Sequence, residues 1–267
     1  MKLADIVRRR SWYTYPLAML LVTPLPANLI AAYPRSGSTW LRTMLVNVIY
    51  PEANSNPEIF NRFIPGISIT HFLHAYTPKI EPRIFSTHSQ YYRGLKRRTV
   101  YVLRDGRDSV LSLFRYSTTR MGIEMDFEDW FQQYTRGHVR WDEHVKSWLT
   151  AGQRALKDDM LIVRYEDMRK DTFFELKRVC EFLNIGCSKE VLNNSIENAS
   201  VANMKKWERE ILGKVITGNS SFYRGGEANE WNSLLTEEQK ARFMALHKET
   251  LALAGYISKR NDNGQNL

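Results

Sequence analysis

The clearest indication of the fold comes from the segment Leu29-Ile30-Ala31-Ala32-Tyr33-Pro34-Arg35-Ser36-Gly37-Ser38-Thr39-Trp40. It begins as a short apolar run that Pro34 ends, and small residues then lead into the segment 39–50, where apolar residues recur at helical spacing. This pattern predicts a strand, a tight turn and a helix. Such a turn leaves unpaired backbone N–H groups at the helix start, where the peptide dipoles favour an anion. We therefore expect phosphate or sulfate to bind at this turn.

The side chains of the turn suit the same purpose. Gly37 permits a close approach of the backbone, Arg35 offers a planar fork for an oxyanion, and hydroxyl donors come from Ser36, Ser38 and Thr39. The nucleotide-triphosphate signature, two glycines followed by Lys and Ser/Thr, is absent. On these local grounds a purely structural turn stays open as an alternative.

The rest of the chain repeats the alternation of strand and helix. An apolar run at 100–103 precedes a helical pattern at 109–116, and another at 160–163 precedes a helical pattern at 171–184 that stops before Gly186. Continuous apolar strands between helices predict an α/β fold with a central parallel sheet covered on both faces, and ligands bind where such strands end. We expect one domain over residues 1–258 and a disordered tail over 259–267.

Two more helices have clear start signals. Asp126 precedes an aromatic stripe at helical spacing, and Thr236 with Gln239 forms a capping-box pattern ahead of an apolar segment that ends at Gly255. The stripe consists of Phe127, Trp130, Phe131 and Tyr134. Core packing is the simplest interpretation of both stripes, and an acceptor pocket or a partner surface is the alternative.

Composition narrows the class of protein. The 267 residues are 43% hydrophobic, which excludes a wholly disordered or collagen-like chain, and two cysteines are too few for a disulfide framework. Cys180 lies on an apolar helical stripe, so we expect structural thiols in a reducing compartment. The formal net charge of +9 favours a phosphate-rich partner, for which a small anionic cofactor suffices. A nucleic-acid-binding protein is the alternative that the basic run Arg93, Lys96, Arg97 and Arg98 suggests.

The N-terminus imitates a secretory signal without matching one. Arg8, Arg9 and Arg10 precede an apolar run, but Pro24 and Pro26 interrupt it well short of the ~20 residues that a membrane span needs. We expect a cytoplasmic protein without stable membrane insertion. Whether residues 11–26 contact a membrane or close over a bound acceptor is left open.

Two motifs carry a resemblance to a known family. Tyr33 to Trp40 resembles the 5′-phosphosulfate loop of the cytosolic-type sulfotransferases, which use 3′-phosphoadenosine 5′-phosphosulfate (PAPS) and usually have Lys where Arg35 stands. Residues 101–112 are similar to the 3′-phosphate motif of that family, with Arg104 closing a strand and Ser112 in the following helix. The resemblance implies a P-loop-like anion site in which Arg104 and Ser112 meet the 3′-phosphate.

Other segments match in the same order. Tyr165-Glu166-Asp167 resembles the segment whose tyrosine helps to hold the adenine, and Trp40 resembles the ring that stacks on that base. The segment 222–226, followed by Trp231, is similar to the loop that closes over the cofactor phosphates. Its matching residues are Arg224, Gly225 and Gly226. The implied cofactor is PAPS, which leaves as adenosine 3′,5′-bisphosphate (PAP).

The resemblance also implies a catalytic base. Residues 84–88 resemble the Lys-Thr-His segment of the family, so His88 is the expected general base, and Arg35 is expected to stabilise charge on the departing phosphate. The helix that begins near Trp141 looks like the one bordering the acceptor site. His144 and Trp141 are therefore candidate acceptor contacts, with plain packing as the alternative for His144, and Phe131 of the aromatic stripe is a third candidate.

Some positions depart from the family pattern. Ser86 stands where Lys is usual, Gly225 also replaces a common Lys, and Ala199-Ser200-Val201 replaces Thr-Ser-Phe near the adenine. Residues 232–241 lack the common dimer contact, so the oligomeric state stays open. No metal is expected, because His71 and His74 have no further ligands nearby in the sequence.

The predicted function is transfer of a sulfuryl group from PAPS to a hydroxyl or amine of a small molecule. The aromatic content of the stretches 51–77 and 117–140 suggests a ring-bearing acceptor, with a natural-product or alkaloid-like compound as the first expectation. A nucleotide-dependent phosphotransferase is the main alternative, since Asp167 follows an apolar strand and could imitate a magnesium ligand.

Overall fold

The computed structural model describes residues 27–53, 63–66, 82–93, 95, 97–120, 122–136, 139–212 and 226–258. Within these ranges one parallel sheet has the strand order β2-β1-β3-β4. Its strands are β1 (Asn28–Ala32), β2 (Ile84–Thr87), β3 (Thr99–Leu103) and β4 (Met160–Arg164). The predicted α/β fold with a central parallel sheet is confirmed. The predictions for residues 1–26 and for the tail 259–267 lie outside the described residues.

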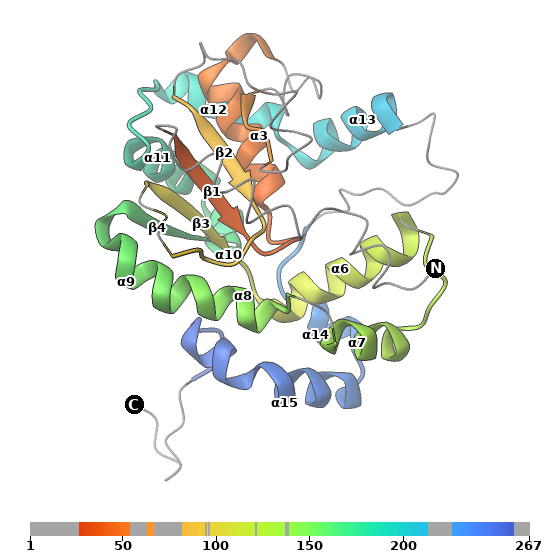
Figure 1. The fold of residues 1–267 in the computed structure, drawn as a ribbon. Coiled ribbons are helices and arrows are strands. Elements are labelled where there is room, and N and C mark those ends of the chain that lie inside the picture. The colour runs from red at the N-terminus through yellow and green to blue at the C-terminus, as the bar shows by residue number, and fades with distance from the viewer. Residues whose placement is uncertain are drawn as a thin grey trace.

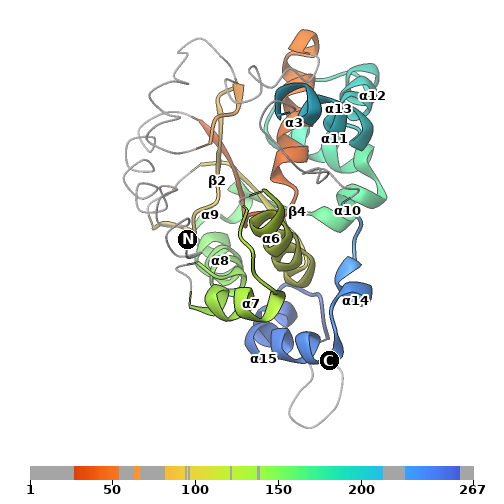
Figure 2. The same cartoon turned by 90° about the vertical axis from the view of Figure 1, so that its right-hand side faces the viewer.

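Helices cover both faces of the sheet (Figures 1 and 2). One face carries α3 (Ser38–Ile49), α10 (Tyr165–Lys170), α11 (Thr172–Phe182) and α12 (Lys189–Asn198), with α13 (Val201–Leu212) beyond them. The other face carries α6 (Gly106–Arg120), α7 (Phe127–Thr135), α8 (Trp141–Ser147), the π-helical turn η3 (Trp148–Gly152), α9 (Gln153–Leu156) and α15 (Glu237–Leu253), with the short α14 (Glu230–Leu234) beside α6. The 3₁₀ turns η2 (Pro51–Ala53) and η4 (Lys157–Asp159) complete the elements.

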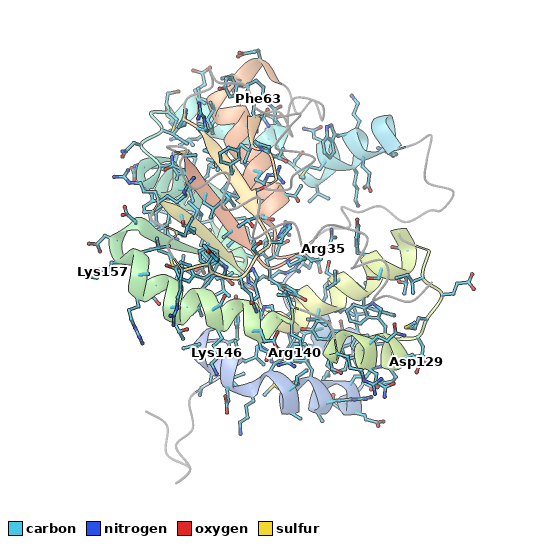
Figure 3. All side chains as sticks on the ribbon, in the orientation of Figure 1. Arg35, Phe63, Asp129, Arg140, Lys146 and Lys157 are labelled. Carbon is cyan, nitrogen blue, oxygen red and sulfur yellow. The ribbon has the colours of Figure 1, made fainter. Side chains whose placement is uncertain are left out.

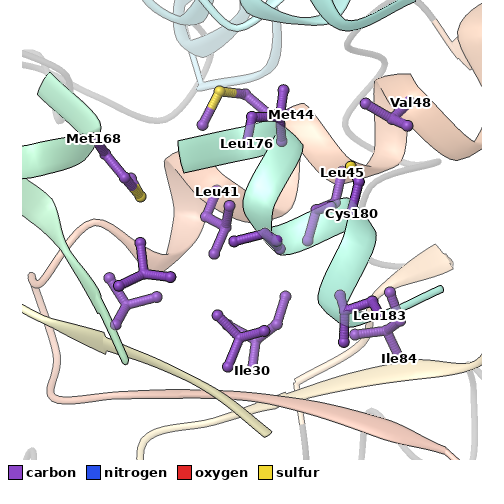
Figure 4. Packing of buried hydrophobic residues seen from close by; sticks show 14 of the residues in the cluster. Ile30, Leu41, Met44, Leu45, Val48, Ile84, Met168, Leu176, Cys180 and Leu183 are labelled. Atoms are coloured by element: carbon purple, nitrogen blue, oxygen red, sulfur yellow. The ribbon is translucent and has the colours of Figure 1, made fainter. Parts of the chain in front are cut away.

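The alternation of side chains along the strands divides the core into two clusters. Leu29, Ala31 and Tyr101 face α6, α7, α8 and α15, whereas Ile30 and Val100 face α3, α11 and α12. Figure 4 shows the second cluster, in which Cys180 is a buried free thiol, as its place on the apolar stripe predicted. Because both faces are covered, β1, β3 and β4 are nearly continuous apolar runs, whereas β2 ends with the polar residues Ser86 and Thr87.

Local signals placed the helix starts well. The Asp126 carboxylate accepts a hydrogen bond from the Asp129 N–H at 2.9 Å, and Thr236 with Gln239 forms the predicted capping box. The helix predicted over 109–116 is longer and begins at Gly106. None of the helices within the described ranges combines the length and apolar content that crossing a bilayer requires.

Candidate active site

The turn between β1 and α3 has the geometry of an anion site. Its backbone enters the left-handed region at Arg35 (φ 70°) and at Gly37 (φ 93°), and α3 begins immediately afterwards. The residue at the N-cap position of α3 is Gly37, which has no side chain to cap the helix. The backbone N–H groups of its first turn are therefore available to an anion, and the helix dipole favours one there.

Arg35 joins this turn to α6. Its Nε donates to the Ser112 hydroxyl at 3.2 Å, and the Ser36 hydroxyl lies 3.4 Å from that of Ser109 on the same helix. Figure 3 shows Arg35 at the end of the sheet, beside the start of α6. The two motifs that were predicted to hold opposite ends of one ligand are thus in direct contact.

Arg104 is the second cation of the site. It follows β3, is only 6% exposed, and donates to two carbonyl oxygens, that of Arg35 at 3.2 Å and that of Glu227 at 3.0 Å. Its guanidinium lies 4.2 Å from the centre of the Tyr165 ring. Its Nε is buried and has no hydrogen-bond partner among the described residues. A buried donor without a partner fits an anionic ligand group at this position.

The segment that begins at Gly226 is fastened to the same place. The Tyr165 hydroxyl donates to the Gly226 carbonyl, and the Asp108 carboxylate accepts from the N–H groups of Asn229 at 2.7 Å and Trp231 at 3.0 Å. Arg224 and Gly225 lie outside the described residues. The chain that follows them contacts Arg104 and Tyr165 through Glu227 and Gly226, and the phosphate-closing role of this loop stays a prediction.

Trp40, the predicted adenine-stacking ring, lies beside Tyr165 and Ala199, and its contact with adenine stays a prediction. Its Nε1 donates to the Ala199 carbonyl at 3.1 Å, and its ring meets Tyr165 edge to face at 6.0 Å between centroids. The replaced segment 199–201 is thus in contact with Trp40 through its backbone. A carbonyl contact of this kind tolerates a change of side chain, so the departure at Ala199 leaves the Trp40 orientation intact.

His88 lies at the end of β2, the neighbour of β1. Its ring is half-buried, and Nδ1 donates to the carbonyl oxygen of Ala32, the last residue of β1, at 2.8 Å. Since a carbonyl only accepts, this bond places the proton on Nδ1 and leaves the lone pair on Nε2. Burial lowers the pKa of His88 to about 4, and the cationic side chains of Arg42 and Arg35 act in the same direction. His88 is therefore a neutral proton acceptor near pH 7.

These residues form one constellation. An uncapped helix start, two arginines and a neutral histidine surround the ends of β1, β2 and β3. A family model described as the sulfotransferase domain matches residues 25–255. The chain belongs to this sulfotransferase family. The resemblance that the motifs indicated is confirmed, and the phosphotransferase alternative is not favoured.

Known sulfotransferases are similar to this chain over most of its length. Cytosolic sulfotransferase 3 of Arabidopsis thaliana is 28% identical over 90% of this chain and 84% of its own length. The 3-beta-hydroxysteroid sulfotransferase of Cavia porcellus is 25% identical over 87% of this chain and 85% of its own. A crystal structure of retinol dehydratase with retinol and PAP superimposes with a TM-score of 0.70 at 21% identity, covering 90% of this chain and 86% of that one. The structural likeness supports the fold.

Gly37 is required by the packing of the sulfotransferase loop. A Cβ at this position would lie 2.4 Å from Cδ2 of Tyr165, and the backbone has a positive φ. Gly122 also has a positive φ, of 64°, but a Cβ there would meet no atom of the described part of the chain within 4 Å. A comparison of alanine substitutions at these two glycines therefore separates the cost of backbone strain from the cost of steric overlap.

We expect Gly37→Ala to lower the free energy of unfolding by about 3 kcal/mol, because strain and overlap with Tyr165 add. Gly122→Ala is expected to lower it by about 1 kcal/mol from strain alone. Urea unfolding of both variants measures the difference. Equal losses would show that the Tyr165 ring moves aside without cost.

Arg42 is a site residue that the motifs did not reveal. It lies on α3, is 8% exposed, and its Nη2 donates to the Ile64 carbonyl. Ser86, which replaces the usual Lys, is buried, and its N–H donates to the Pro65 carbonyl at 2.9 Å. The signal for Arg42 was an arginine beside Leu41 within an apolar helix, because a charge is seldom buried without a purpose.

The three candidate acceptor contacts are buried. His144 has no exposed surface, and its Nδ1 is 3.1 Å from the Tyr101 hydroxyl; burial lowers its pKa to about 3. The Trp141 Nε1 donates to the Arg104 carbonyl at 3.2 Å. Phe131 packs against Tyr134 and Phe243. We therefore expect Trp141 and Phe131 to support the site from within the core, while acceptor contact by His144 stays a prediction.

The structure also bears on the basic run and on the predicted absence of a metal. Arg97 and Arg98 of the basic run donate to the carbonyls of Ala27 and Phe182, at 3.3 Å and 3.1 Å, so part of that run stabilises the fold. Within the described ranges no three His, Cys, Asp or Glu side chains gather as a metal site requires. His71 and His74 lie outside those ranges, and independence from metal stays a prediction.

Proposed function

We propose that this sulfotransferase transfers the sulfuryl group of PAPS to a hydroxyl or amine of a small molecule, with His88 as the general base. One observation carries this proposal: the His88 ring is hydrogen-bonded to Ala32, three residues before Arg35. The base and the anion-binding turn therefore share the end of β1. PAP accompanies retinol in the retinol dehydratase structure, which supports the same cofactor here.

The residues present fit the cofactor. The α3 N-terminus and Arg35 suit its 5′-phosphosulfate, while Ser112 and Arg104, whose Nε has no partner in the part of the chain that the structure describes, suit the 3′-phosphate. Trp40 and Tyr165 would hold the adenine. Ser36, Ser38 and Thr39 add hydroxyl donors along the turn, and we assign the closing role to Arg224, Gly225 and Gly226.

PAPS supplies an activated sulfuryl group when it is bound. The lone pair on His88 Nε2 takes the proton of the acceptor hydroxyl or amine as its oxygen or nitrogen bonds to sulfur, and the bond from sulfur to the 5′-phosphate oxygen breaks. Arg35 and the first-turn N–H groups of α3 stabilise the charge left on that phosphate. Arg42, buried on the same helix, adds positive charge on the His88 side of the site.

The names of two relatives support the choice of acceptor group. The Cavia porcellus relative is named for a hydroxysteroid, and an amine sulfotransferase of Oryctolagus cuniculus is also similar to this chain. The aromatic stripe of α7 lies mostly in the core, so it no longer argues for a ring-bearing acceptor. A hydroxyl or amine on a small natural product is the class that we propose.

Titration with PAP in the presence of EDTA tests the cofactor. We expect a dissociation constant in the micromolar range or tighter, a standard binding free energy of about −8 kcal/mol or stronger. Incubation with radiolabelled PAPS and pools of hydroxysteroids, phenols and amines then identifies the acceptor. Absence of PAP binding, or binding that EDTA abolishes, would contradict the proposal.

The dependence of kcat on pH below neutrality should report the protonation of His88. Protonation below its pKa removes the lone pair, so kcat is expected to fall as the pH decreases through about 4, well below the ordinary histidine value of 6.5. The same lowered pKa makes the folded state lose stability as the pH falls from 6.5 toward 4, because the unfolded chain binds the proton first. Brief assays between pH 4 and 8, with unfolding measured alongside, separate the two effects. A midpoint near 6.5 in kcat would indicate a solvated His88 or another base.

A further inference from the structure

The segment that follows His88 rests on the helix that begins at Trp141. Residues 88–92 belong to no helix or strand, and two hydrogen bonds fasten them to the junction of α8 and η3. Trp148 Nε1 donates to the Ser89 carbonyl at 3.0 Å, and the Tyr91 N–H donates to the Ser147 hydroxyl at 3.0 Å. The Ser147 hydroxyl in turn donates to the His144 carbonyl at 2.7 Å.

The Trp148 ring is itself firmly held. It has no exposed surface, it stacks on Tyr101 of β3 with centroids 5.3 Å apart and an interplanar angle of 19°, and it meets Tyr91 edge to face at 5.5 Å. The π-helical turn that begins at Trp148 ends at Gly152, where a Cβ would lie 3.2 Å from the Tyr91 ring. Such turns are costly and are often retained at functional sites.

His88 is therefore held from two sides. Its own Nδ1 donates to Ala32 at the end of β1, and the carbonyl of the next residue, Ser89, accepts from Trp148. One bond sets the orientation of the ring and the other sets the path of the backbone that carries it. A base must lie within hydrogen-bond reach of the proton it removes, so a shift of about 1 Å can cost about a hundredfold in rate.

We propose that Trp148 and Ser147 are positioning residues, which set the place of the His88 ring through the backbone of Ser89 and Tyr91. Neither side chain needs to touch the cofactor or the acceptor. The inference rests on the proposed role of His88 as the base. It adds that the junction of α8 and η3 is part of the catalytic machinery.

Trp148→Phe removes the N–H donor and keeps an aromatic ring in its place. We expect kcat to fall about tenfold to a hundredfold, while KM for PAPS and the PAP dissociation constant change by less than about twofold. The matched control is Trp130→Phe, because the Trp130 indole is equally buried and its Nε1 has no hydrogen-bond partner among the described residues. That variant is expected to keep the kcat of the original chain.

A smaller change tests the second bond. Ser147→Ala removes the acceptor of the Tyr91 N–H and is expected to lower kcat by about fivefold to tenfold, whereas Ser147→Thr, which keeps the hydroxyl, restores it. This pair remains informative if Trp148→Phe fails to fold. Equal kcat for Ala, Thr and Ser at position 147 would contradict a positioning role for this residue.

A double-variant cycle separates this inference from the function on which it rests. Trp148→Phe should lower kcat only while His88 is present and should have no further effect in a His88→Asn background. If His88→Asn is inactive but Trp148→Phe is fully active, the positioning role of Trp148 is overturned while the role of His88 as the base stands. An active His88→Asn overturns the assigned base, and equal losses in both backgrounds reduce Trp148 to a structural residue.

Discussion

His88→Asn is expected to lower kcat by about two to four orders of magnitude, since a positioned general base contributes about that much. The asparagine amide can still donate to the Ala32 carbonyl, as Nδ1 of the histidine does at 2.8 Å, but it offers no basic nitrogen to the acceptor. The proposed cofactor contacts lie on the turn, at Arg104 and on α3, α6 and α10, and none of them involves His88, so the PAP dissociation constant should change by less than about threefold. Single-turnover rates with labelled PAPS, together with PAP titration, measure both quantities.

A second buried histidine provides the control. His247 on α15 has no exposed surface, and its Nδ1 lies 3.2 Å from Oδ1 of Asp142. It is far along the chain from the residues proposed to act in catalysis. His247→Asn should lower stability while the folded enzyme keeps its kcat. If His88→Asn retained more than about a tenth of the original kcat, the base would have to be sought elsewhere, with His144 first in line.

Arg104→Ala is expected to weaken PAP binding by about two to three orders of magnitude, because charge-assisted hydrogen bonds to a phosphate are among the strongest in proteins. The side chain is buried and its Nε has no hydrogen-bond partner among the described residues. Its loss should be specific to the 3′-phosphate. We therefore expect adenosine 5′-phosphate, which lacks that group, to bind the variant and the original chain with affinities within about threefold of each other.

The matched charge control is Arg115→Ala. Arg115 is also on the segment that follows β3, but it pairs with Glu230 at 3.3 Å, and its removal changes the net charge by the same amount. Titration of the variants with PAP and with adenosine 5′-phosphate completes the comparison. Equal weakening of both nucleotides by Arg104→Ala, or a loss in Arg115→Ala that matches it, would show that Arg104 acts through general charge or loop stability.

Local patterns predicted the strand, turn and helix at 29–50, because apolar spacing and small residues act over a few positions. They underestimated the length of α6, since glycine at position 106 by itself indicates a turn. In the folded chain Gly106 is the place where the Trp141 ring packs: a Cβ there would lie 2.4 Å from that ring. The helix therefore begins at a glycine because of a contact made by a residue far along the chain.

The site shows the same division. Arg104 and Ser112 were assigned from the family resemblance of residues 101–112 and Arg35 from the turn after β1, and the structure brings these residues into contact through two hydrogen bonds. Arg42 was missed, because nothing in its immediate neighbourhood says that the side chain turns toward Ile64 and the His88 side of the sheet. The aromatic stripe of α7 was open to two interpretations, and only the packing of α15 against it places Phe131 in the core.

The amino-acid order alone predicted most of the strands, several of the helices and a turn suited to an anion, since hydrophobic periodicity, caps and turn chemistry depend on neighbours within a turn or two of the backbone. Only the folded arrangement decided which nitrogen of His88 carries the proton, which arginines surround it, and that Trp148 reaches the Ser89 carbonyl. These relations join residues tens of positions apart. They depend on the strand order β2-β1-β3-β4 and on the direction in which each side chain leaves its element, and no local pattern encodes either.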